Sequence, residues 1–344
     1  MTMDTAARIK APESLPASWY GDPALWQKER KAIYGASWNL VARLDQLAEP
    51  GAYVAQVVAG WPVFVLKGRD GELRAFHNVC RHRAAPMVDD GEGRCEVLRC
   101  RYHGWVYDQE GRLRKAPDFG ADIDLAEFGL IAIRVEVWRQ LVFVCLSEAT
   151  APLATWLGSL GERSKRYPIE RMKFHQALVI DLGVNWKTYG DNYAEGYHVP
   201  TIHPALDRAI EMKTYEVECA VEEGIQVHRA AAAGGGTSGL WLWKFPGLFL
   251  NIYDWGMSIV RLEPLDHARS QLVYWYLFAD DSPATAAKRD EMMRWSLTIV
   301  DEDKKICREV QRNLDAGVYA TGRLSPVLET GVIQFQDWVR ERVG

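Results

Sequence analysis

The sequence predicts an α+β protein with two domains, a small all-β domain followed by a larger domain in which helices cover an antiparallel sheet. Its 344 residues exceed what one hydrophobic core usually serves. Short runs rich in valine and aromatic residues, separated by polar turns, fill the first part of the chain. We expect a helical lead over 1–38 that packs on the second domain, a β domain over 39–148 and the larger domain over 149–344.

Bulk properties exclude several classes of protein. The apolar content of 48% fits a globular chain, and the net charge of −5 argues against a nucleic-acid partner. No apolar run approaches the length of a transmembrane helix, and Met1–Pro16 does not resemble a signal peptide. The six cysteines follow no disulfide-framework spacing. We therefore expect a cytoplasmic protein with no membrane or nucleic-acid partner.

Two hairpins are predicted in the β domain. Ala52–Val58 and Pro62–Lys67 are strand-like, and a polar turn then leads into Glu72–Val79. Further along, Trp105–Asp108 and Arg112–Lys115 flank a second turn. Each hairpin carries a Cys/His pair, which we expect at its tip.

The larger domain is predicted to begin with a helix and to continue as strands. Ala151–Glu162 has leucines on one helical face, and Ala284–Asn313 is the longest helical candidate. The predicted strands between them are Gln176–Asn185, Tyr215–Arg229, Leu240–Tyr253, Met257–Leu262 and Ser270–Phe278.

The two Cys/His pairs have the ligand set of an iron–sulfur cluster. Cys80 and His82 form a C-x-H motif, and after seventeen intervening residues Cys100 and His103 form C-x-x-H. Two thiolates on one iron and two imidazoles on the other hold a Rieske [2Fe–2S] cluster. A structural Cys2His2 zinc site is the alternative, but zinc sites usually pair like with like. The mixed halves favour iron–sulfur.

These motifs resemble those of the Rieske non-haem iron oxygenases, in particular their large α subunit, the family of aromatic ring-hydroxylating dioxygenase α subunits. The resemblance rests on Cys80–Arg83, Cys100–Trp105, Asn185–Lys187 and the stretch Asp191–Pro204. It extends over nearly the whole chain. It implies a Rieske domain followed by a catalytic domain of the helix-grip type.

A mononuclear iron site is expected in the second domain. His198 and His203 would diverge by about 140° on an ideal helix, but Pro200 and Pro204 interrupt helix here, so a local break can bring both imidazoles to one metal. Two histidines and one carboxylate form the facial triad of non-haem Fe(II) oxygenases. The resemblance points to Asp303 as the carboxylate.

Asp301 is the alternative third ligand, and a solvated helix face accounts for the intervening Glu302. The resemblance also implies that Glu195 bridges to a cluster histidine of a neighbouring subunit, although family members often have Asp there. Asp191 and Asn192 are expected to support a ligating histidine or a pocket water.

The remaining histidines are interpreted as ordinary buried or surface residues, because none has a ligand partner at a useful spacing. They are His77, His175, His228 and His267.

The resemblance implies partners and cofactors outside the chain. No G-x-G-x-x-G motif lies between a strand and a helix, so electrons from NAD(P)H should arrive through a separate reductase or ferredoxin. Within the chain the cluster would pass electrons to Fe(II), which activates O2. A homotrimer, or an assembly built on trimers, is expected.

The substrate is less well defined by the sequence. The tail, Ile306–Arg312 and Gly322–Pro326, looks like the branch with choline, glycine betaine and carnitine monooxygenases. That branch suggests hydroxylation of a quaternary ammonium or N-methyl compound, with demethylation or C–N cleavage. The aromatic stretch Trp241–Trp255 could bind a cation through its ring faces or could be strand core.

Three other functions stay open. An aromatic ring-hydroxylating dioxygenase would use the same aromatic residues to hold a flat substrate. A Rieske electron carrier without oxygenase activity would need no second metal. A zinc-stabilised binding module would be colourless.

Overall fold

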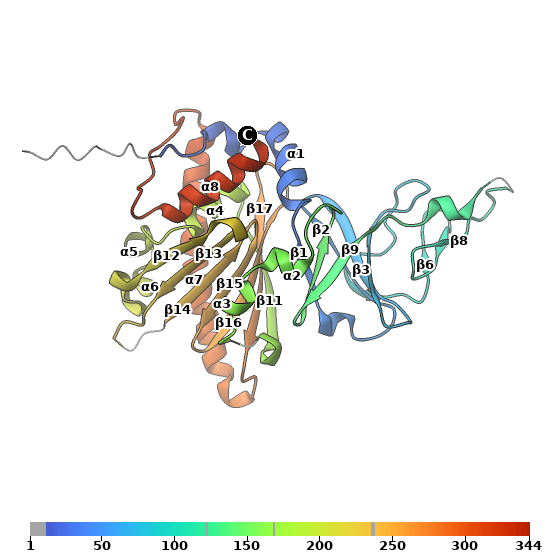
Figure 1. Ribbon diagram of the computed structural model, residues 1–344. Coiled ribbons are helices and arrows are strands. Elements are labelled where there is room, and N and C mark those ends of the chain that lie inside the picture. The colour runs from blue at the N-terminus through green and yellow to red at the C-terminus, as the bar shows by residue number, and fades with distance from the viewer. Residues whose placement is uncertain (1–11, 121–122, 168, 235–237) are drawn as a thin grey trace, which may run out of the picture. The chain divides into compact units, whose positions relative to one another are not determined.

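The structure is a computed structural model that describes residues 12–344 except 121–122, 168 and 235–237 (Figure 1). The chain forms two compact units, one of Arg30–Arg171 and one of the residues up to Glu29 together with Met172–Gly344. Residues 30–38 and 149–171 thus group with the β unit, whereas the sequence-based boundaries lay at 38/39 and 148/149. Residues 1–11 of the expected lead lie outside the described residues.

The unit Arg30–Arg171 is built on two antiparallel sheets (Figure 1). The larger has the strand order β1-β10-β9-β4-β3-β2-β5, and the smaller has the order β6-β7-β8. Two short helices follow the last strand. The elements are β1 Asn39–Arg43, β2 Ala52–Val58, β3 Trp61–Lys67, β4 Leu73–His77, β5 Gly91–Arg94, β6 Leu98–Arg99, β7 Val106–Tyr107, β8 Leu113–Lys115, β9 Ala132–Trp138, β10 Leu141–Cys145, α2 Leu153–Leu157 and α3 Leu160–Arg163.

Both predicted hairpins are present, since β3 pairs with β4 and β7 with β8. The positions of the Cys/His pairs differ in detail from the prediction. Cys100–His103 lies in the turn between β6 and β7, but Cys80–His82 lies in the loop that leaves β4. The single helix predicted over Ala151–Glu162 is wrong. It breaks at Gly158, whose φ of +54° is left-handed.

The second unit contains one antiparallel sheet with the order β11-β17-β16-β15-β14-β13-β12 and helices packed on it (Figure 1). The elements are α1 Pro23–Glu29, β11 Lys173–Asp181, α4 Trp186–Tyr193, α5 Val199–Ile202, α6 Pro204–Ala209, β12 Glu216–Ala220, β13 Ile225–Ala230, β14 Gly239–Lys244, β15 Leu248–Tyr253, β16 Gly256–Pro264, β17 Ser270–Phe278, α7 Ala286–Asp315 and α8 Thr330–Val343. The predicted α+β class is confirmed.

Two of the predicted strands are in fact hairpins. Tyr215–Arg229 turns at Gly224, whose φ of +60° suits glycine, so that β12 pairs with β13. Leu240–Tyr253 turns at Pro246 and Gly247, so that β14 pairs with β15.

Among the described residues, no helix combines the length and apolar character that crossing a membrane requires.

Helix α7 has one continuous buried stripe. Its buried residues recur at steps of three and four, which is the period of one helix face. Asp303 lies within this stripe, one turn before Cys307, whereas Asp301 lies on the exposed side. The buried residues are Arg289, Met293, Ser296, Val300, Asp303, Cys307 and Gln311.

The Asn-Trp-Lys motif fixes the start of α4. The Asn185 side chain caps the helix by accepting a hydrogen bond from the Lys187 backbone N–H at 2.9 Å. Lys187 Nζ forms a fully buried ion pair with Glu29 of α1 at 2.6 Å, and Trp186 Nε1 donates to the same carboxylate at 2.9 Å. Removing one partner of such a pair typically costs about 3–5 kcal/mol. The motif therefore orients the helix that leads into the site.

Candidate functional site

The two Cys/His pairs of the β unit lie in loops with the same hydrogen-bond pattern. The amide of Cys80 donates to the carbonyl of Ala85, and the amide of Ala84 donates back to Cys80. Cys100 and Gly104 make the equivalent bonds one loop further on. Ala84 and Gly104 have φ of 57° and 72°, so both loops turn in the left-handed region at the fourth residue after the cysteine. One turn geometry thus presents both ligand pairs.

The side chains in these loops suit a Rieske cluster. The cysteines are free thiols, each only 2% exposed. The His82 and His103 rings lie edge to face with centroids 4.5 Å apart, and the Trp105 ring stacks on His82 at 4.9 Å. His82 Nδ1 is buried and has no hydrogen-bond partner among the described residues, as a metal ligand requires. Two thiolates and two imidazoles are the Rieske donor set.

Tyr107, which sequence reasoning missed, is a polar neighbour of the predicted cluster ligands. Its hydroxyl lies 3.6 Å from Cys80 Sγ and accepts a hydrogen bond from the Arg81 amide at 3.2 Å. Because that amide uses the acceptor side of the hydroxyl, the phenolic proton is available to the sulfur. Hydrogen bonds to cluster sulfurs are one determinant of Rieske potentials.

In the second unit, a break between two short helices brings His198 and His203 together. His203 lies between α5 and α6 with φ −118° and ψ 73°, which is not helical. The following Pro204 disfavours helical geometry at the residue before it. The two Nε2 atoms are consequently 3.2 Å apart, as expected from the prolines.

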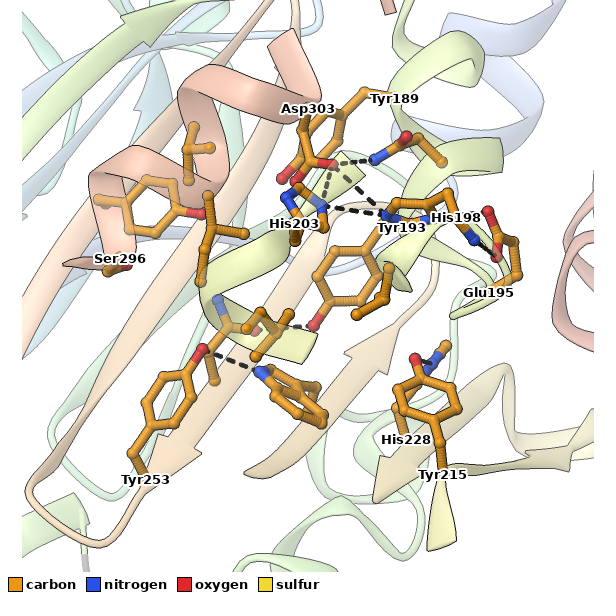
Figure 2. Close-up of a pocket in the computed structure, with 18 residues that line it drawn as sticks. Tyr189, Tyr193, Glu195, His198, His203, Tyr215, His228, Tyr253, Ser296 and Asp303 are labelled. Atoms are coloured by element: carbon orange, nitrogen blue, oxygen red, sulfur yellow. Dashed lines mark hydrogen bonds and ion pairs between the residues drawn. The ribbon is translucent and has the colours of Figure 1, made fainter. Parts of the chain in front are cut away.

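Asp303 of α7 completes a group of three possible metal ligands (Figure 2). Its Oδ1 lies 2.9 Å from His203 Nε2 and 3.6 Å from His198 Nε2. Ligand atoms about 2.1 Å from a metal and at right angles to each other lie about 3.0 Å apart, so one face of an octahedral ion fits these positions. Asp301 does not approach the histidines and instead pairs with Lys304 at 2.8 Å.

The ligand group is strongly coupled electrostatically. Burial lowers the pKa of His198, but the carboxylates of Asp303 and Glu195 outweigh this effect and raise the pKa to about 9. Burial raises the pKa of Asp303, whereas the two imidazoles lower it to about 2. Asp303 is therefore ionised at neutral pH, and a metal ion must displace a proton to bind His198.

A carboxylate orients each histidine from behind. Glu195 Oε1 lies 2.6 Å from His198 Nδ1, and Glu302 Oε2 lies 2.7 Å from His203 Nδ1. Engaging Nδ1 leaves each Nε2 directed to the shared centre. The interpretation of Glu302 as part of a solvated helix face was wrong. Its neighbour Asp303 faces inward, but only the tertiary fold places His203 within reach of Glu302.

The structure separates the roles of Asp191 and Asn192. Asn192 Nδ2 donates to Asp303 Oδ1 at 2.8 Å and so holds a ligand carboxylate. Asp191 contacts no histidine in the described structure. It accepts hydrogen bonds from Tyr20 Oη and from Gln336 Nε2, the latter at 2.9 Å. Burial raises its pKa to about 6 against these hydrogen bonds.

A cavity of about 90 Å³ adjoins the three ligands (Figure 2). It lies between one face of the sheet and helices α4 to α7. Its walls are largely aromatic, with Tyr193, Tyr215, Trp241 and Tyr253 among them. Among the described lining residues, the charged side chains other than histidines are the carboxylates of Glu195 and Asp303.

Some aromatic residues of the stretch 241–255 line the cavity, and others belong to the strand core. Trp241 and Tyr253 line the cavity, and Trp241 Nε1 donates to Tyr253 Oη at 2.9 Å. Trp243 is completely buried in the core, and the Trp255 ring stacks on the Tyr253 ring with centroids 4.8 Å apart. His228, interpreted from sequence as ordinary, also lines the cavity. Its position depends on strand register, which the sequence did not reveal.

A Cys2His2 loop pair in one unit and a His2Asp face in the other define the class of Rieske non-haem iron oxygenases. Comparison with known families agrees with this assignment. Residues 37–134 match the Rieske [2Fe-2S] domain, and residues 169–240 and 233–344 match the ring hydroxylating alpha subunit (catalytic domain). The chain belongs to the ring-hydroxylating α-subunit family and is a Rieske terminal oxygenase.

Several relatives in this family act on quaternary ammonium compounds. Chloroplastic choline monooxygenase of Amaranthus tricolor is 27% identical over 342 residues, covering 95% of this chain and 77% of the relative. The glycine betaine monooxygenase oxygenase subunit of Pseudomonas aeruginosa strain UCBPP-PA14 is 26% identical, covering 96% and 89%.

Solved structures share the fold. The quaternary ammonium Rieske monooxygenase CntA in complex with L-carnitine aligns with a TM-score of 0.86 at 24% identity, covering 98% of this chain and 97% of that one. Naphthalene 1,2-dioxygenase from a Rhodococcus species aligns with a TM-score of 0.78 at 18% identity, covering 95% and 94%.

Proposed function

We propose that this oxygenase uses O2 to hydroxylate a small quaternary ammonium or N-methyl compound beside nitrogen, with electrons supplied by a separate reductase. The observation that carries the proposal is the lining of the cavity, which presents several aromatic ring faces. Ring faces attract a desolvated ammonium group, at about 2 kcal/mol or more for a buried cation–π contact. The choline, glycine betaine and carnitine relatives support the same substrate class.

An aromatic ring-hydroxylating dioxygenase is the second candidate, because the same aromatic walls could hold a flat ring. The same substrate screen tests both candidates.

The residues around the ligands have distinct tasks in this reaction. A ferrous iron held by His198, His203 and Asp303 would supply the O2-activating chemistry of the non-haem oxygenases. Asn192 and Glu302 keep Asp303 and His203 in place through bonds of 2.8 and 2.7 Å. The aromatic walls exclude water and hold the ammonium group, so that one N-methyl faces the ligand triad.

We infer that electrons reach this site from the Rieske cluster of a neighbouring subunit in a homotrimer, through Glu195. Glu195 lines both the ligand cavity and a second, open pocket of about 850 Å³ with apolar walls from α7 and α8. Its carboxylate already engages His198, so a cluster histidine seated in the open pocket would complete a short path. One related quaternary ammonium Rieske monooxygenase is described as using inter-subunit electron transfer.

The proposal is tested by O2 uptake with the iron-loaded enzyme and a generic reductase. Choline, glycine betaine, carnitine, N-methyl amines and simple aromatic acids are offered in parallel, and hydroxylated or demethylated products are measured. Uptake coupled to product with the ammonium compounds alone is expected. Coupled turnover of the aromatic acids alone would refute the proposal and favour the dioxygenase.

Metal content provides an independent check. A loaded oxygenase should hold about three irons per chain, and an electron carrier about two. Asp303→Ala should keep the brown cluster and lose the third iron. The matched control Asp301→Ala, on the exposed side of the same helical turn, should keep all three. Normal turnover by Asp303→Ala would show that the assigned ligand is wrong.

A further inference from the structure

A row of cross-strand neighbours runs along the cavity face of the second unit's sheet. His228 of β13 is opposite Trp241 of β14, which is opposite Asn251 of β15. Asn251 is opposite Ser258 of β16, and Ser258 is opposite Tyr276 of β17. Directly paired residues project from the same face of a sheet, so this row forms one continuous surface.

One polar atom in the row has no partner. His228 Nε2 forms no hydrogen bond among the described residues, although the residue is only 1% exposed and lines the cavity. A buried donor left unsatisfied costs about 1–3 kcal/mol. The other polar side chains of the row are all satisfied, by the pairs Trp241 Nε1 to Tyr253 Oη (2.9 Å), Tyr193 Oη to Asn251 Oδ1 (2.7 Å), Asn251 Nδ2 to Ser258 Oγ (3.2 Å) and Tyr276 Oη to Ser296 Oγ (3.1 Å).

The neighbouring Tyr215 contacts the other ring nitrogen of His228. Its hydroxyl lies 2.8 Å from His228 Nδ1, and the two side chains form a pair apart from the ligand triad (Figure 2). Burial, with a smaller contribution from His198, lowers the pKa of His228 to about 3, so the imidazole is neutral. When the phenol donates to Nδ1, one bond satisfies both groups and the single imidazole proton lies on Nε2. In this tautomer His228 offers an N–H donor.

The charges of the cavity indicate which acceptor this donor would take. Neither lysine nor arginine is among the described lining residues, so these residues offer a substrate carboxylate no cationic side chain. A buried carboxylate would need a cationic partner, which a neutral imidazole does not provide. A hydroxyl or carbonyl oxygen needs only a hydrogen bond.

We propose that His228 is a positioning residue whose Nε2–H binds an uncharged oxygen of the substrate, so that the enzyme prefers N-methylated ammonium alcohols or ketones to betaines. The inference rests on the proposed function and names its substrate class. The aromatic walls hold the ammonium end, and His228 holds the oxygen end. Together they select which N-methyl group faces Asp303.

The wild-type enzyme tests the proposal without any substitution. Choline, its hydroxyl-free match ethyltrimethylammonium, and glycine betaine are compared by kcat/KM for coupled product formation. Choline should exceed both others by about tenfold or more, because each lacks the neutral acceptor. Equal values for choline and ethyltrimethylammonium, or a preference for glycine betaine, would overturn this inference alone. No turnover of any ammonium compound would overturn the proposed function as well.

Two variants separate positioning from a merely structural role. His228→Phe keeps a ring but removes the donor, and it should lower kcat/KM for choline to about the value for ethyltrimethylammonium. His228→Gln places an amide donor near the position of Nε2 and should restore at least part of the preference. Unchanged iron content and cluster spectrum establish that each variant is folded. A preserved choline preference in folded His228→Phe would refute the role.

Discussion

Replacing Glu302 by alanine should weaken binding of the mononuclear iron while leaving the Rieske cluster intact. Glu302 Oε2 lies 2.7 Å from His203 Nδ1, on the side of the ring opposite the ligand atom. Without this carboxylate, the ring loses the partner that fixes both its orientation and the position of its proton.

The expected magnitude follows from this geometry. A hydrogen bond to a charged group contributes about 1.5–3 kcal/mol when buried. The Glu302 side chain is 30% exposed, so solvent screening favours the lower end of that range. A loss of about 1.4 kcal/mol corresponds to a tenfold weaker iron affinity, at the lower limit for a carboxylate behind a metal-bound histidine.

The assay is anaerobic titration with Fe(II) in competition with a chelator, while the EPR signal of the reduced cluster is followed as an internal reference. Asp301→Ala is the matched control, because the exposed Asp301 side chain pairs with Lys304 one turn further along α7. Glu302→Gln, which keeps an acceptor oxygen but no charge, should lie between wild type and Glu302→Ala. Wild-type iron affinity in Glu302→Ala, or an equal loss in Asp301→Ala, would refute the reasoning.

Three further outcomes are expected. Tyr107→Phe removes the hydroxyl near Cys80 Sγ. It should lower the reduction potential of the cluster by about 40 mV, which corresponds to about 1 kcal/mol for one electron. EPR-monitored redox titration measures this change, and an unchanged potential would exclude the hydrogen bond. Gly104→Ala should lower the free energy of unfolding by only about 1 kcal/mol, measured by thermal unfolding, and should keep the cluster. The reason is that Ala84 adopts the same left-handed geometry in the Cys80–Ala85 loop. Loss of the cluster would contradict the equivalence of the two loops. The pKa of Asp191 in the folded state is about 6, above its usual value of 3.8, so the native state binds more protons than the unfolded state between these pH values. Stability should therefore fall as the pH rises from 4 to 6. Relative to Asp191→Asn, the wild type should lose up to about 3 kcal/mol of unfolding free energy over this range, and an identical pH dependence of the two proteins would contradict the shift.

Local sequence patterns predicted the spacing of candidate ligands, a helix break and the bounds of one strand. The Cys/His spacing predicts the cluster ligands, since a thiolate and an imidazole within one short loop need no long-range information. The prolines beside His198 and His203 predicted a break that lets two histidines five residues apart share a centre. The bounds of β17, Ser270–Phe278, agree with the strand predicted from its valine and aromatic residues.

Tertiary structure decided what depends on distant partners. The sequence distinguished Asp303 from Asp301 only through the family resemblance. In the structure, the buried stripe of α7 includes Asp303 and leaves Asp301 exposed. Glu302 gained its partner His203 from nearly one hundred residues away. His228 reached the cavity because the register of β13 on β14 sets it beside Trp241. Spacing along the chain fixes which groups can act together locally, but long-range contacts arise from packing and register, which one sequence does not reveal.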